Sequence, residues 1–186
     1  SHHEHRMAVV ADDRASLERE LDGWLARGSG VEPRRRPPLV FVFPGSGTRW
    51  RGAGRELWQR EAGFTAALEA ADAALRRQGC ASVIDAVVRA AAEPVAAEPG
   101  VDVMQPALFA LEVALAAQWR AWGVIPDAVV GHSLGEVAAA HVAGALSLDD
   151  AARVVVHRSR LLRRLEGRGA MVVVELAAPA VQERLR

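Results

Sequence analysis

The chain has 186 residues, 51% of them hydrophobic, and its 23 basic and 23 acidic residues cancel. Balanced charge gives no reason to expect nucleic acid or an anionic membrane surface as a partner, and no apolar run approaches the ~18 residues of a membrane span. The single cysteine, Cys80, excludes an internal disulfide and fits a reducing compartment, so we expect a globular, cytoplasmic chain without membrane insertion.

Residues 1–38 are interpreted as part of a separate packing unit. Residues 6–11 are typical of a strand, and Asp12 or Asp13 is expected to cap a helix with apolar residues at helical spacing. Residues 28–38 have the Gly, Pro and Arg content of a linker. The three histidines among the first five residues could belong to a metal site or to a tag, and their spacing without a cysteine partner argues against a metal.

An apolar run at residues 39–43 predicts a strand buried on both faces of a parallel sheet, followed by a glycine-flanked turn at residues 44–47. Helices are expected at about residues 55–78 and 82–92. Gln105 and Pro106 open a further, largely buried helix that extends to residue 122, with proline at its tolerated first position. Gln105 is interpreted either as a capping side chain or as a site residue.

The most informative stretch surrounds Ser133. A short β-branched run at residues 127–130 is followed by Gly131-His132-Ser133-Leu134-Gly135 and then by helix formers at residues 136–145. This is the G-x-S-x-G pattern of a nucleophile elbow, in which a sharp turn exposes a serine between a strand and a helix. The N-terminus of that helix would favour a developing oxyanion.

Ser147 begins a predicted capping box, and the helix that follows is expected to reach residue 165. Its apolar stripe is interrupted by Arg158, which therefore occupies the core face. Counting ~1.5 Å per residue along two antiparallel helices returns Arg158 to the height of Ser133, where a guanidinium would suit a carboxylate. A snorkelling arginine, or one paired with a structural acid, is the alternative.

A catalytic serine needs a general base, and no histidine in the sequence is convincing. His132 points elsewhere on the turn, His141 is ~12 Å along the helix axis, and His157 is rotated ~100° from Arg158. Either Ser133 is not a nucleophile or its base lies beyond Arg186. Residues 170–176 then predict a strand and Pro179 begins a last helix, and the alternation of strands and helices predicts an α/β fold with a mainly parallel sheet.

Taken together, five motifs resemble those of the malonyl-CoA:acyl-carrier-protein transacylase family, most of all the acyltransferase domain of a modular type I polyketide synthase. They are Phe43-Pro44-Gly45-Ser46-Gly47, Gln105-Pro106-Ala107-Leu108, Gly131-His132-Ser133-Leu134-Gly135-Glu136, Arg158 and Gly169-Ala170-Met171. The resemblance implies a hydrolase-like large subdomain at residues 39–168 and the start of a small ferredoxin-like subdomain at 169–186. Residues 1–38 resemble part of the linker between a ketosynthase and such a domain.

The resemblance also implies roles. Ser133 would take an extender acyl group from acyl-CoA and pass it to the phosphopantetheine of an acyl carrier protein. The backbone N–H groups of Ser46 and Leu134 would form the oxyanion hole, Arg158 would hold the extender carboxylate, and Gln105 and His132 would line the site. No bound cofactor or metal is expected, and an adjacent ketosynthase domain is expected in the same polypeptide.

Two departures from the family pattern stand out. Ser46, Thr48 and Arg49 replace residues that include glutamines in the family, which removes side-chain contacts but keeps a backbone donor. The family's catalytic histidine lies downstream, so the 186-residue chain alone is expected to be nearly inactive. Leu134 favours a malonyl extender, whereas residues 101–105 are closer to methylmalonyl-selecting domains, and we expect malonyl. An α/β-hydrolase acting as an esterase or thioesterase, or a non-catalytic scaffold, are the alternatives.

Overall fold

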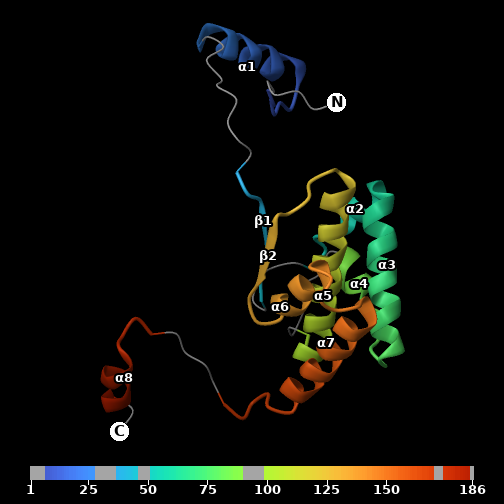
Figure 1. Ribbon diagram of the computed structural model, residues 1–186, viewed down its shortest axis with the longest axis vertical. Helices are drawn as coiled ribbons and strands as arrows, with labels where there is room; N and C mark the ends of the chain where they lie inside the picture. Colours follow the sequence, from blue (N-terminus) through green and yellow to red (C-terminus); the bar gives the residue numbers. More distant parts are fainter. Residues whose placement is uncertain (1–6, 28–36, 46–50, 90–98, 170–173, 185–186) are drawn as a thin grey trace. The chain divides into compact units, whose positions relative to one another are not determined.

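The computed structural model describes residues 7–27, 37–45, 51–89, 99–169 and 174–184 (Figure 1). The chain separates into two units, residues 1–38 and 39–186.

The described residues of the first unit form helix α1 (Arg14–Arg27) and the segment before it. The start of α1 is capped by Asp13, whose carboxylate accepts a 2.7 Å hydrogen bond from the Ser16 N–H, while the Ser16 hydroxyl accepts one of 3.1 Å from the Asp13 N–H. The capping prediction is therefore confirmed for Asp13. The predicted strand is wrong for residues 7–11, which form no regular structure. The backbone N–H and C=O groups of a strand need hydrogen-bond partners on a neighbouring strand. No described residue pairs with this segment.

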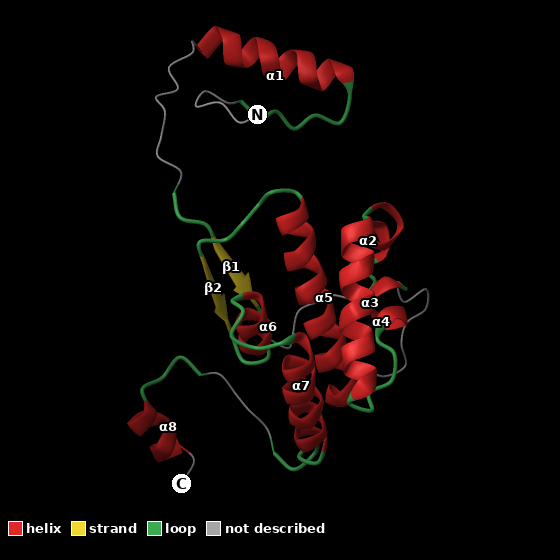
Figure 2. Cartoon of the chain, turned by 45° about the vertical axis from the view of Figure 1, so that its right-hand side comes forward, coloured by secondary structure: helices red, strands yellow, loops and turns green. Residues whose placement is uncertain are grey.

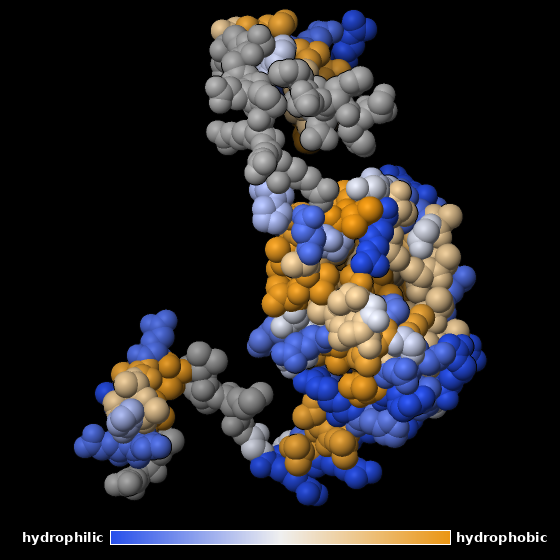
Figure 3. Space-filling model, viewed as in Figure 1, coloured by the Kyte–Doolittle hydropathy of each residue, from blue (hydrophilic) through white to orange (hydrophobic). Residues whose placement is uncertain are grey.

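The second unit contains a parallel pair of strands, β1 (Val40–Phe43) and β2 (Ala128–Gly131). Helix α6 (Gly135–Val142) packs against both strands. The prediction that β1 is buried on both faces is wrong for the described residues, because Val40 and Val42 are 45% and 69% exposed. Figure 3, which has the same view as Figure 1, shows apolar surface where the two strands lie. The described helices thus bury only part of the sheet's apolar surface.

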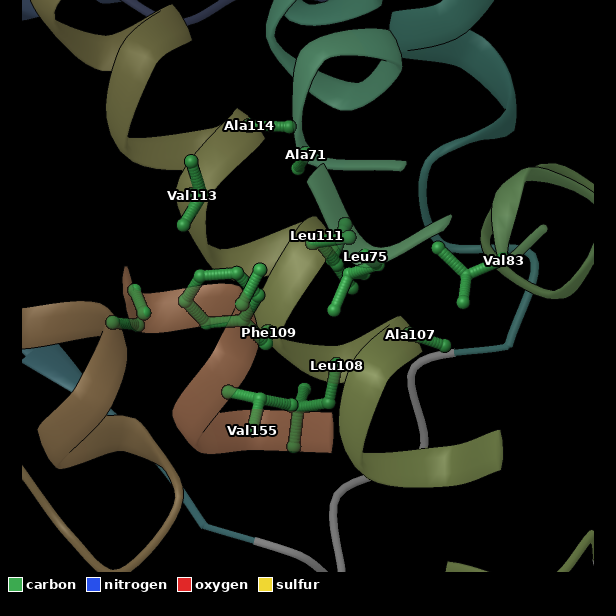
Figure 4. Close-up of a cluster of buried hydrophobic side chains, with 14 of the residues drawn as sticks. Ala71, Leu75, Val83, Ala107, Leu108, Phe109, Leu111, Val113, Ala114 and Val155 are labelled. Carbon is green, nitrogen blue, oxygen red and sulfur yellow. The ribbon is translucent and has the colours of Figure 1, made fainter. Parts of the chain in front are cut away.

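Helix α5 (Val101–Ala121) is the centre of the helical layer. It packs against α3 (Ala62–Arg77), α6 and α7 (Leu148–Arg163), and Figure 2 shows it between the two strands and α3. Figure 4 shows the core formed where these helices meet, with side chains from α3, α5 and α7 such as Leu75, Phe109 and Val155, all fully buried. This core holds α5 and α7 side by side, which positions the site described below.

Helix boundaries differ from the sequence prediction in two places. The helix expected at residues 55–78 is split into α2 (Arg55–Arg60) and α3, because Glu61 adopts an extended conformation with φ −119° and ψ 100°. Helix α5 begins at Val101, so Pro106 lies inside the helix rather than at its first position. The short helix α4 (Ile84–Val88) falls within the segment expected to be helical.

Helix α7 begins as its capping box predicts, since the Ser147 hydroxyl accepts a 3.1 Å hydrogen bond from the Asp150 N–H. The predicted strand at residues 170–176 lies partly outside the described residues, and residues 174–176 form no strand. A last helix, α8 (Ala178–Arg184), follows near the predicted Pro179 start and buries none of its residues.

Within the described part of the chain, α5 alone is long and apolar enough to cross a membrane, and 67% of its most apolar window is buried inside the fold. It passes on mean hydropathy, because polar residues such as Glu112 interrupt its apolar run. A core helix surrounded by other helices meets the same criteria, so the feature is weak evidence for a membrane span.

Candidate active site

Ser133 lies in a tight turn between β2 and α6. Its φ of 55° is the only positive value at a non-glycine residue in the described ranges. Such a left-handed conformation is strained for a residue with a side chain and is found mainly where function requires it. The turn therefore presents the serine in a conformation that ordinary loops avoid.

Glycine is required on both sides of this serine. A Cβ added to Gly131 would overlap the backbone of Glu136, and one added to Gly135 would lie 2.5 Å from the Phe43 carbonyl carbon and 2.7 Å from the Pro44 carbonyl oxygen. The first turn of α6 thus crosses the ends of both strands without room for a methyl group. This close approach fixes the position of Ser133 relative to the sheet.

The structure brings Arg158 and Gln105 to Ser133. Arg158 Nη2 donates a 2.7 Å hydrogen bond to Ser133 Oγ, and Arg158 Nη1 donates one of 2.6 Å to Gln105 Oε1. Gln105 is only 3% exposed, whereas Ser133 is exposed and Arg158 is half-buried. Side chains from α5, from α7 and from the turn before α6 therefore meet at one place.

Arg158 reaches this place because α7 packs its apolar stripe on α5. Ala151 and Val155 of that stripe are fully buried, and Arg158 continues it toward the end of the helix, while His157 is exposed. In the described part of the chain, Arg158 forms no ion pair with a carboxylate. Its positive charge is held by neutral oxygens, which leaves it able to attract an anionic group to the serine.

No described histidine contacts the Ser133 hydroxyl. The His132 ring lies against Gly45, where an added Cβ would be 2.9 Å from His132 Nδ1. His141 Nδ1 lies 3.1 Å from the Leu146 carbonyl oxygen at the end of α6, and His157 is exposed. The described residues thus contain the serine and the guanidinium but not a general base in contact with them.

Of the two candidate oxyanion donors, Ser46 and Leu134, the structure describes only Leu134. Ser46 lies outside the described residues. The preceding Gly45 approaches the serine, because a Cβ added to it would lie 3.4 Å from Ser133 Cβ. Leu134 is fully buried at the N-cap of α6, directly after the serine. Pro44 and Gly45, which follow β1, therefore lie beside the turn that carries Ser133 and the N-terminus of α6.

Glu112 on α5 is a buried acid that the sequence reasoning missed. Its two carboxylate oxygens have no hydrogen-bond partner among the described residues, and burial raises its pKa to about 8. It faces a hollow of about 660 Å³ between β1 and α5, which none of Ser133, Gln105 or Arg158 lines. A glutamate within the otherwise apolar run of residues 106–117 is the signal that could have identified it.

The comparisons with known proteins agree with this geometry. The acyl transferase domain family matches residues 40–186. The chain therefore belongs to the acyl transferase domain family. No group of three or more His, Cys, Asp or Glu side chains that could hold a metal ion is found among the residues with a described position.

Its relatives are modular polyketide synthases. The chain is 46% identical over 191 residues to erythronolide synthase EryA2 of Saccharopolyspora erythraea, covering 99% of the chain but 5% of that relative. It is 47% identical to the spectinabilin polyketide synthase system protein NorC of Streptomyces orinoci, covering 97% of the chain and 8% of that relative. The chain thus spans a small fraction of the length of these proteins.

Solved structures show the same likeness. The acyltransferase domain from module 8 of the salinomycin polyketide synthase matches with a TM-score of 0.73 and 42% identity, over 94% of this chain and 42% of that one. A loading acyltransferase from the avermectin modular polyketide synthase matches with a TM-score of 0.63 and 48% identity, over 69% of this chain and 40% of that one. The mixed α/β fold with a small parallel sheet is therefore that of polyketide synthase acyltransferase domains.

Proposed function

We propose that this chain is the part of a polyketide synthase acyltransferase domain that carries the nucleophile and the recognition site for the acyl group. The turn between β2 and α6 acts as the nucleophile elbow of a hydrolase-like subdomain. Ser133 attacks the thioester carbonyl of an extender acyl-CoA, the carbon–sulfur bond breaks, and CoA leaves as the protonated thiol. The phosphopantetheine thiol of an acyl carrier protein then attacks the serine ester, the carbon–oxygen bond breaks, and the thiol proton restores the Ser133 hydroxyl.

The observation that carries this proposal is the paired hydrogen bonding of Arg158 to Ser133 and Gln105. In a malonyl group, a free carboxylate is separated from the thioester carbonyl by a single carbon. When the carbonyl carbon meets Ser133 Oγ, the carboxylate must therefore lie close to the same hydroxyl. The Arg158 guanidinium lies within hydrogen-bond distance of Oγ. It is therefore placed to donate hydrogen bonds to both oxygens of the malonyl carboxylate.

The remaining groups support the same reaction. The backbone N–H groups of Leu134 and Ser46 are proposed to stabilise the tetrahedral oxyanion, with the N-terminus of α6 adding its positive end. His132 lines the entrance beside Gly45. The general base that accepts the serine proton is proposed to come from outside the described residues, because no described histidine contacts Ser133.

The relatives support a wider context for the chain. Residues 39–168 are proposed as the large subdomain, residues 169–186 as the beginning of a ferredoxin-like subdomain, and residues 1–38 as part of the linker from a ketosynthase. The partners would then be acyl-CoA, an acyl carrier protein and the adjacent ketosynthase domain of a cytoplasmic multienzyme, with no bound cofactor. Malonyl is the proposed extender and methylmalonyl the alternative. A hydrolase that uses water as acceptor gives Arg158 no comparable task.

Acyl labelling tests this proposal. The parent polypeptide is incubated with radiolabelled malonyl-CoA, and the label is mapped by proteolysis. We expect label on the peptide that contains Ser133, its transfer to a carrier protein, and its absence in Ser133→Ala. Retained labelling in Ser133→Ala would overturn the assignment of the nucleophile, and release of free malonate in place of transfer would favour a thioesterase.

A further inference from the structure

The first turn of α5 is poorly supported by its own sequence. Pro106 has no N–H to donate to the Asp102 carbonyl, so one helical hydrogen bond is missing. Gly100 occupies the N-cap and provides no side-chain cap. Gln105, which contacts Arg158, lies at the end of this weakened segment. The segment therefore needs support from elsewhere if Gln105 is to keep a fixed position.

That support comes from the end of α7. Glu166 Oε1 accepts a 3.0 Å hydrogen bond from the Val101 N–H, which is one of the donors left free at the start of α5. Arg163 Nε lies 3.6 Å from Asp102 Oδ1, and Arg163 Nη1 is hydrogen-bonded to Glu166 Oε2. Arg163 at the end of α7 and Glu166 in the turn that follows thus attach to the first turn of α5.

The fit around Gly100 supports the same arrangement independently. A Cβ added there would lie 2.6 Å from Asp102 Oδ1 and 2.8 Å from Arg163 Cζ, and would overlap Arg163 Nη1. The Arg163 guanidinium therefore lies directly against the backbone that precedes α5. A side chain at this position would push the guanidinium away from its place beside Asp102.

These contacts join the same two helices as the Gln105–Arg158 hydrogen bond. Asp102 precedes Gln105 by three residues on α5, and Arg163 follows Arg158 by five residues on α7. At ~1.5 Å per residue, the second connection lies only about one turn away from the first along each helix. Two connections between two helices restrict sliding and rotation, which one connection alone does not.

We propose that Asp102, Arg163 and Glu166 form a positioning clamp that sets the register of α5 against α7 and thereby holds Gln105 and Arg158 in line for the extender carboxylate. This inference rests on the proposed function of Arg158. The three clamp residues do not touch the substrate, so they are positioning residues. Their side chains are about half exposed, and ion pairs of this kind contribute modestly, so their loss should weaken selection rather than abolish transfer.

The test compares malonyl-CoA with acetyl-CoA in the parent polypeptide. Arg163→Met and the isosteric Asp102→Asn each remove the ion pair between Arg163 and Asp102, and Arg163→Lys keeps the charge. Arg153→Met is the matched control, because Arg153 also lies on α7 and forms an exposed ion pair, at 3.2 Å from Asp150, but does not contact α5 in this way. We expect the malonyl-to-acetyl ratio of kcat/KM to fall about three- to tenfold in Arg163→Met and Asp102→Asn. Arg163→Lys and Arg153→Met should stay within about twofold of the wild type.

A second measurement separates positioning from general destabilisation. In a Gln105→Ala background, Arg163→Met should lower the ratio less than it does in the wild type, because the clamp acts in part through Gln105 and effects on a shared path do not add. An unchanged ratio in Arg163→Met, an equal loss for both substrates, or fully additive effects would each overturn the clamp while leaving malonyl transfer intact. Failure of the wild-type parent to acylate Ser133 would instead overturn the proposed function, and the clamp with it.

Discussion

Gln105 and Glu112 are both buried on α5, seven residues apart, yet their surroundings differ. Seven residues are close to two helical turns, so both side chains project from similar sides of the helix. Gln105 accepts a 2.6 Å hydrogen bond from Arg158, whereas both carboxylate oxygens of Glu112 lack a partner among the described residues. The described residues therefore satisfy the polar groups of the proposed recognition site, but not those of the region between α5 and β1.

The difference shows which parts of the fold are self-sufficient. Around Gln105, three elements supply a donor, an acceptor and a hydroxyl that satisfy each other. Around Glu112, burial without a partner is costly and is reduced only by keeping the carboxyl protonated. Activity should therefore be most sensitive to changes at the first region, and stability should improve with changes at the second.

The largest expected effect follows from Arg158→Ala in the parent polypeptide. Removing the partner of a desolvated carboxylate costs about 2–4 kcal/mol, so kcat/KM for malonyl-CoA should fall about thirty- to thousandfold. Acetyl-CoA has no free carboxylate and should lose less than about fivefold. Steady-state transfer with the two substrates measures this, and equal losses for both would show that Arg158 does not recognise the carboxylate.

A smaller effect is expected for Gln105→Ala. The Nη1 group of Arg158 would lose its acceptor and the guanidinium would move more freely, so kcat/KM for malonyl-CoA should fall about tenfold. Gln118→Ala is a useful comparison, because Gln118 is also buried on α5 but donates to Glu61, away from the serine. It should lower the melting temperature without changing the malonyl-to-acetyl ratio, and a matching fall in that ratio would remove the special role of Gln105.

Glu112→Leu should stabilise the 186-residue chain, in contrast to the two changes above. Replacing a buried, unpartnered carboxyl with an apolar side chain of similar size should raise the free energy of unfolding by about 1–2 kcal/mol at pH 8. Glu69→Leu on the exposed side of α3 is the control and should change it little. Urea unfolding measures both, and a destabilised Glu112→Leu would mean that the carboxylate has a partner after all.

The pH dependence of stability gives the signal most specific to Glu112. The pKa of Glu112 is raised from 4.5 to about 8 in the folded chain, because burial disfavours the charged form. Between these values the folded state binds more protons than the unfolded state, so the contribution of Glu112 to stability is full below pH 4.5 and is lost as the pH rises to about 8. Glu112→Gln should flatten this decline, and an unchanged slope would contradict the raised pKa.

Much of the site could be predicted because its signals are local. The strand–turn–helix around Ser133 follows from glycines and β-branched residues next to each other in the sequence. The position of Arg158 follows from counting along α6 and back along α7, whose Ser147 cap and apolar stripe are clear. The sequence did not decide whether Gln105 is a capping side chain or a site residue, because the contacts of its amide depend on how α5 packs against α7.

The errors arise where distant contacts decide the outcome. The extra first turn of α5 precedes a proline and is supported by Glu166, far along the chain, so local rules placed the helix start too late. Residues 7–11 have strand-like composition but no described neighbour. Val42 in β1 has the composition of a strand buried on both faces, yet whether such a face is covered depends on the elements that pack on it.

The most direct test of the central claim is the structure of the parent polypeptide with malonyl attached to Ser133. Our account predicts that the malonyl carboxylate replaces the Ser133 hydroxyl as an acceptor for Arg158, while the hydrogen bond from Arg158 to Gln105 remains. A malonyl carboxylate that points to solvent, with Arg158 turned away from it, would contradict the account.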